Sequence, residues 1–221
     1  EKLTPILASS QGTNKEAVLL QKLATRLQDF SEELRTNRGK MLIEAYSAVN
    51  AKEIIDQIAS FTLLPPFEPI ISYVKATIEP FEANSLNNIL LAAQWCIDKE
   101  LPQQGFTQLQ EGIITILCDK ISLNYTKEIN RNFVSSYLSV RFSKPEEEWR
   151  GELSNDTYKP YLHLLDQINN IRELVAIYDL ISKKRNDINH GGFTESAKHS
   201  SFMNDLKKYF HEFKQILNLE Y

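Results

Sequence analysis

Apolar residues recur at intervals of three and four along most of the chain, which is the period of an amphipathic helix. Prolines punctuate this pattern, because proline is tolerated in the first turn of a helix and ends a helix elsewhere. The pattern therefore predicts a series of helices joined by short connections. The expected helices cover about residues 20–34 after a capping box at Thr13 and Glu16, then 39–60, 66–80, 85–97, 102–117, 125–142, 160–185 and 195–219.

No alternation of strands and helices is visible, and the seven glycines do not form a phosphate-binding loop. The sequence therefore predicts an all-α fold with a helical bundle at its centre. We divide the chain into an N-terminal helical linker region, residues 1–84, and a C-terminal domain, residues 85–221. The one long irregular stretch is 143–160, where Trp149 is open to two interpretations, core packing or stacking on a nucleobase.

The composition limits how this protein can bind its partners. Hydrophobic residues make up 42% and charged residues 24% of the chain, which is ordinary for a globular protein. Because the net charge is −4, any contact with nucleic acid must come from a local basic patch, and Lys183-Lys184-Arg185 is one. Cys96 and Cys118 have no second cysteine or histidine at zinc spacing, so we expect reduced core residues and neither a metal nor a cofactor.

The sequence also carries weak information on location. No apolar run is long enough to span a membrane, and no secretory signal is visible. We therefore expect a cytoplasmic protein with no membrane partner. The chain begins at Glu1 and not at a methionine, which is compatible with a fragment, a processed form or a tag-cleaved protein.

The candidate chemistry lies in Arg185 and His190, five positions apart and directly before Gly191. A guanidinium binds phosphate bidentately, and an imidazole accepts or donates a proton near neutral pH. RNA carries its own nucleophile, the 2′-hydroxyl, so this pair is suited to cleaving single-stranded RNA without a metal. The expected products are a 2′,3′-cyclic phosphate and a 5′-hydroxyl, and DNA should resist cleavage.

The spacing of this pair raises a geometric question. Residues five apart differ by about 140° around an ideal helix, so Arg185 and His190 would not share a face. Two solutions are open: the helix loosens before Gly191, or the residues meet across a symmetric homodimer. In the second case, two copies of the pair line one composite active site.

The stretch that begins at Arg185 resembles the motif of a known family. Arg185-Asn186, three further residues and His190 are similar to the motif of HEPN ribonucleases. The longer string from Arg185 to Phe193 resembles the version in CRISPR-associated CARF–HEPN ribonucleases of type III systems. A second segment supports the resemblance, and it comprises Ala92-Ala93-Gln94-Trp95-Cys96, Gln103-Gln104-Gly105 and Leu109-Gln110-Glu111-Gly112.

The resemblance implies roles for particular residues. Arg185 and His190 would be the catalytic pair, and Asn186 would position the arginine or the phosphate. To these we add Lys183, Lys184 and Asn189 as substrate-binding residues. Residues 85–221 would then be the HEPN domain. Family members carry a CARF sensor that binds cyclic oligoadenylate, but no such domain is visible here, so we expect the chain alone not to bind that activator.

Two other functions compete with this interpretation. The first alternative is a HEPN toxin of a toxin–antitoxin pair, although such toxins tend to have tyrosine where this sequence has Gly192. The second alternative is a non-catalytic helical dimerisation module. The intact Arg185–His190 pair favours the ribonuclease over both.

Overall fold

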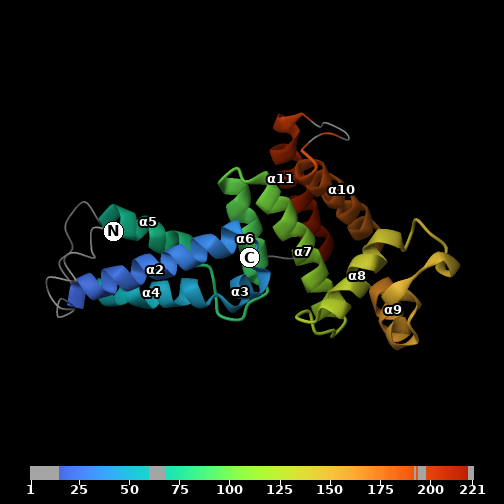
Figure 1. The fold of residues 1–221 in the computed structure, drawn as a ribbon, viewed down its shortest axis with the longest axis horizontal. Coiled ribbons are helices and arrows are strands. Elements are labelled where there is room, and N and C mark those ends of the chain that lie inside the picture. The colour runs from blue at the N-terminus through green and yellow to red at the C-terminus, as the bar shows by residue number, and fades with distance from the viewer. Residues whose placement is uncertain (1–14, 60–67, 192, 194–197, 219–221) are drawn as a thin grey trace. The chain divides into compact units, whose positions relative to one another are not determined.

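The computed structural model describes residues 15–59, 68–191, 193 and 198–218, apart from the side chains of Glu16 and His199. Every regular element among these residues is a helix and no strand occurs among them, so the predicted all-α fold is confirmed. The chain forms two compact units, residues 1–91 and 92–221. Figure 1 shows both units. The capping box at Thr13 and the break at Pro65 and Pro66 fall outside the described residues or rest on residues outside them.

The first unit is built on α2 (Lys15–Arg35), which packs against α4 (Tyr46–Ile58), and α4 in turn packs against α5 (Glu68–Ile78). Its core is apolar, as the helical stripes predict. The buried side chains include Leu23, Phe30, Leu34, Leu42, Ala48, Ile55, Ile58 and Ile78. Ile70 of α5, by contrast, is 56% exposed.

The helix expected over residues 39–60 is in fact two helices. α3 (Gly39–Glu44) ends at Ala45, which has a left-handed φ of 52°, and α4 begins at the next residue. The side chain of Asn88 supports this break, because its amide donates to the carbonyls of Leu42 and Ile43 over 2.9 and 3.1 Å. Asn88 lies in α6 (Asn87–Asp98) and is fully buried. A buried asparagine thus satisfies main-chain acceptors that a broken helix exposes.

The second unit is organised around α7 (Pro102–Lys120), which packs against α8 (Glu128–Val140), α10 (Ile171–Asn189) and α11 (His199–Leu217). Pro102 occupies the first turn of α7, as predicted. The core includes Phe106, Leu109, Ile113, Leu117, Phe133, Leu174, Ile181, Leu206 and Phe213. Gly105 lets α11 approach closely, because a Cβ there would collide with the side chain of Leu206.

The helix expected over residues 160–185 is also divided. α9 (Lys159–Asp166) stops, and α10 starts after Asn170, which has a left-handed φ of 58°. Asparagine tolerates this conformation better than other residues with a side chain. The prediction that Arg185 closes the helix was wrong as well, since α10 continues through Asn189.

A charged cluster fixes α9 to α8. Tyr137 donates to Asp166 over 2.7 Å, and Arg141 donates to the same carboxylate through Nε and Nη2 over 2.8 and 2.9 Å. Burial would raise the pKa of Asp166, but the hydrogen bonds from Arg141 and Tyr137 outweigh it and lower that pKa. The cluster therefore favours the ionised carboxylate.

The stretch 143–160, expected to be irregular, contains three short 3₁₀ turns: Glu146–Glu148, Gly151–Ser154 and Asp156–Tyr158. Trp149 is only 5% exposed, and its indole donates to the Lys144 carbonyl over 3.3 Å. Tyr158 stacks on Phe133 with the ring centroids 4.5 Å apart. Trp149 is thus a packing residue, which decides between the two interpretations of its role.

Candidate functional site

Arg185 lies in α10, one helical turn after the buried Ile181 and therefore on the same side of the helix. Its side chain is half-buried. The Nε atom is buried and has no hydrogen-bond partner among the described residues. A buried guanidinium nitrogen without an acceptor is unusual, because such a group loses its hydration without compensation. Arg185 Nε is therefore an unsatisfied donor that is closed off from solvent in this structure.

His190 follows the last residue of α10 and is exposed. Its backbone N–H still donates to the Asn186 carbonyl over 2.9 Å, so the helical path extends to it. Gly191 then turns the chain with a left-handed φ of 65°, as the sequence predicts. Gly192 lies outside the described residues.

The structure does not bring Arg185 and His190 together within one chain. Because the helical path is unbroken between them, they are separated by about 140° around the axis and about 7.5 Å along it. The explanation that the helix loosens before Gly191 was therefore wrong. The alternative, a meeting across a dimer, stays a prediction.

Side chains of α7 hold α10 along its length. Gln103 Nε2 donates to Asn189 Oδ1 over 3.3 Å, and Gln110 Nε2 donates to Ser182 Oγ over 3.1 Å and to Tyr178 Oη over 3.3 Å. From the first contact to the second, the residue number rises by seven on α7 and falls by seven on α10, so the two helices run antiparallel here. Both glutamines belong to the second segment on which the family resemblance rests, and this segment thus lies against the Arg185 motif.

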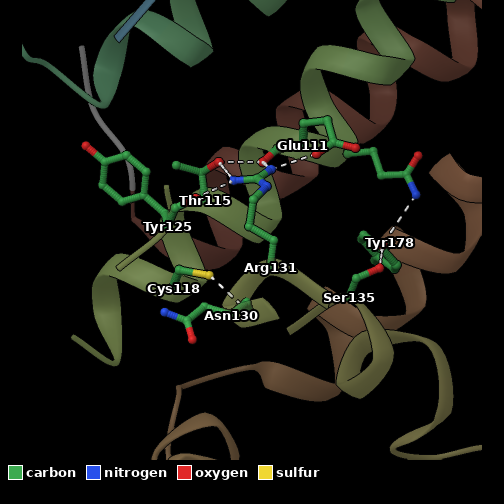
Figure 2. A network of polar contacts seen from close by, with 9 residues as sticks. Glu111, Thr115, Cys118, Tyr125, Asn130, Arg131, Ser135 and Tyr178 are labelled. Carbon is green, nitrogen blue, oxygen red and sulfur yellow. Dashed lines mark hydrogen bonds and ion pairs between the residues drawn. The ribbon is translucent and has the colours of Figure 1, made fainter. Parts of the chain in front are cut away.

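A polar network extends this contact to α8. Tyr178 and Ser135 share a hydrogen bond of 3.0 Å, and Figure 2 shows their side chains meeting between α10 and α8. In the same view, Arg131 reaches α7, where it donates to Glu111 Oε2 over 2.6 Å and to Thr115 Oγ1 over 2.8 Å. The pattern of apolar positions gave no signal for these contacts, which join three helices beneath the motif.

The cysteines have the structural role that we predicted. Both are buried, and neither forms a disulfide. Burial raises the pKa of Cys96 to about 12 and that of Cys118 to about 11. These thiols therefore stay protonated and unreactive near neutral pH.

The two predicted substrate-binding lysines differ in environment. Lys184 forms an ion pair with Asp205 of α11 over 2.7 Å, and its Nζ lies 5.5 Å from the centre of the Phe202 ring. Lys183 pairs with Asp179 of its own helix over 2.7 Å, and both side chains are well exposed. Asn186 and Asn189 are exposed near the end of α10. Lys184 thus ties α10 to α11, whereas Lys183 stays on the outer surface.

Comparison with protein-family models, with curated proteins and with solved structures finds no match. Across the described ranges, no helix combines the length and the apolarity that a membrane crossing requires. Within the same ranges, no group of three or more His, Cys, Asp or Glu side chains is arranged to hold a metal ion.

Proposed function

We propose that this protein is an endoribonuclease of the HEPN type, with Arg185 and His190 as its catalytic residues. One observation carries the proposal: a half-buried arginine with an unpaired Nε and an exposed histidine lie at the end of one anchored helix. The first is equipped to bind a phosphate, and the second is accessible for proton transfer. The motif resemblance adds the reaction class.

The reaction uses the nucleophile of the substrate. The 2′-hydroxyl oxygen attacks the adjacent phosphorus while a histidine accepts its proton, and the P–O5′ bond breaks as a protonated histidine gives a proton to the leaving 5′-oxygen. The Arg185 guanidinium balances the negative charge that develops on the phosphoryl oxygens, and Asn186 assists in positioning. A strand with 2′,3′-cyclic phosphate and one with 5′-hydroxyl result. The mechanism requires no cofactor.

A homodimer resolves the separation of the two residues. In a two-fold dimer, each surface meets its own copy, so that an arginine and a histidine from different chains can line one cleft. This arrangement does not require the two side chains to share a helix face. The composite site is therefore consistent with the straight path of α10.

The resemblance also places the activity in antiviral defence. We propose that the protein acts in the cytoplasm as an effector of type III CRISPR systems, and that cyclic oligoadenylate controls it through a CARF domain outside these 221 residues. Residues 85–221 then form the effector domain. Isolated chain of this length should neither bind cyclic oligoadenylate nor change activity when it is added, which calorimetry can measure.

The decisive experiment is product analysis on an end-labelled single-stranded RNA and its deoxy analogue. We expect cleavage of the RNA alone, cyclic phosphate ends, and no effect of excess EDTA. His190→Ala should abolish cleavage, whereas the matched control His211→Ala, at an exposed position of α11, should not. Equal rates for His190→Ala and wild type, or strong inhibition by EDTA, would contradict the proposal.

A mixing experiment tests the composite site. Arg185→Ala and His190→Ala are each expected to be inactive, but a mixture forms heterodimers with one intact arginine and one intact histidine. Cleavage should therefore reappear on mixing. A mixture of His190→Ala with the double variant is the control and should stay inactive. A wild-type protein that is fully active as a monomer in sedimentation would overturn the shared site.

A further inference from the structure

A groove of about 490 Å³ lies between α8 and α10, away from Arg185. One side includes Ser139 of α8 and, in the turn that follows α8, Phe142 and Ser143, and the α10 side includes Arg172 and Lys183. The lining includes hydroxyl groups, two cations and one aromatic ring that is 39% exposed, together with one carboxylate and three aliphatic side chains. These are the groups with which proteins contact phosphates and bases of single-stranded nucleic acids.

The Arg172 side chain is fixed in this groove by a contact with Phe142. Its guanidinium carbon lies 4.3 Å from the centre of the Phe142 ring, which fixes the side chain by stacking. Among the described residues, it has no carboxylate partner. Its N–H donors are thus available. By contrast, the neighbouring Arg141 is already engaged by Asp166.

Lys183 provides the second cation. Its pairing with Asp179 is exposed, and exposed pairs of this kind contribute little, so a phosphate can compete for the ammonium group. Asp179 is the one acidic residue that lines the groove, against two cations. The groove therefore carries a net positive charge in a protein whose total charge is −4.

The two cations of the groove lie in line with the proposed catalytic histidine on α10. Arg172 and Lys183 are eleven residues apart, and Lys183 and His190 are seven apart, so all three lie within about 20° of one line along α10. The line is about 27 Å long, enough for several nucleotides of an extended strand. Arg185 lies off this line, nearer the side of α10 that carries Ser182 and Asn189, which contact α7.

We propose that the α8–α10 groove binds the backbone of single-stranded RNA next to the scissile bond, with Arg172 and Lys183 contacting phosphates. This inference rests on the proposed function and deepens it by naming the surface that receives the substrate. Phe142 contributes by keeping the Arg172 guanidinium in the groove through stacking.

The test measures binding without cleavage, by the fluorescence anisotropy of a short labelled 2′-O-methyl RNA strand. Arg172→Ala and Lys183→Ala should each weaken binding about five- to tenfold and reduce the log–log salt slope by about 0.7. Asp179→Asn should tighten binding severalfold, a gain that misfolding does not produce. Lys208→Ala is the matched control, because Lys208 forms the same exposed i,i+4 type of pair with Glu212, and it should bind like wild type.

The outcomes separate this inference from the proposed function. If Arg172→Ala and Asp179→Asn bind the strand like Lys208→Ala while wild type still cleaves RNA, the groove is overturned and the ribonuclease stands. If wild type binds the strand through the groove but never cuts RNA, the groove stands and the proposed ribonuclease function is overturned. A polyglutamate peptide of equal charge should not displace the strand; equal displacement would assign the groove to an acidic protein and overturn the RNA proposal.

Discussion

Gln103 of α7 donates a hydrogen bond to Asn189 of α10 over 3.3 Å, and Asn189 is the residue directly before His190. The position of the candidate catalytic histidine thus depends on a contact from a helix more than eighty residues earlier in the chain. Together with Gln110, this contact fixes both the axial position and the rotation of α10 against α7.

Gln103→Ala should therefore reduce RNA cleavage severalfold with little loss of stability, because an exposed neutral hydrogen bond contributes only about 0.5 kcal/mol. Under the proposed function, the expected effect is on kcat and not on RNA affinity. Single-turnover cleavage measures the catalytic rate, and urea denaturation measures the stability. Gln167→Ala, an exposed glutamine outside this contact, is the control. A loss of several kcal/mol in Gln103→Ala would show that the residue serves stability instead.

Lys184 is expected to act mainly through the ion pair with Asp205. Lys184→Ala and Asp205→Ala should each destabilise the protein by about 1 kcal/mol, since both side chains are about a quarter exposed. The double variant should lose less than the sum of the two, which a double-mutant cycle in urea measures. If Lys184→Ala instead leaves stability unchanged and weakens RNA binding, the lysine acts on the substrate as first predicted from the sequence.

Gly105 sets the spacing between α7 and α11. Gly105→Ala places a Cβ against the Leu206 side chain, so we expect a loss of about 1–3 kcal/mol from overpacking despite the better helix propensity of alanine. Thermal unfolding measures the loss. Adding Leu206→Ala should remove the clash, and the double variant should then be more stable than the two separate effects predict. An increase in stability of Gly105→Ala would contradict the tight contact.

The Asp166 cluster predicts a dependence of stability on pH. Because the pKa of Asp166 is lowered from 3.8 in the folded protein, its contribution is complete above the unfolded-state value and is lost as the pH falls through the folded value. Asp166→Asn should cost about 2 kcal/mol at neutral pH and flatten the acid limb of a urea stability profile. Asp156→Asn, at an exposed pair with Lys159, should change the profile much less.

Local signals in the sequence predict much of the fold. The apolar period gives the all-α class, Pro102 marks the start of α7, and Gly191 marks the turn after α10. The breaks at Ala45 and Asn170 were missed because the spacing of apolar residues continues across both sites. A left-handed residue costs little enough that packing decides whether it occurs, and packing partners are not local in sequence.

The site follows the same division. Arg185 and His190 are recognisable from their spacing alone, but their separation around α10 depends on how far the helix extends. The partner of Lys184 is Asp205, twenty-one residues away on another helix, and no pattern of charges identifies it in advance. Arg172 and Phe142 were not candidates, since a lone arginine and a lone phenylalanine form a recognisable pair only when the fold brings α10 against the turn after α8.

Because α10 starts after the left-handed turn at Asn170, its rotation about its own axis does not depend on the helix that precedes the turn. One residue inserted among positions 167–170 would be absorbed by the turn, and α10 would keep its orientation. One residue inserted between Asp179 and Lys183 would rotate the remainder of the helix by about 100°. His190 would then leave the line that it shares with Arg172, without any change in the composition of the motif. Changes in length thus have opposite consequences on the two sides of a single asparagine.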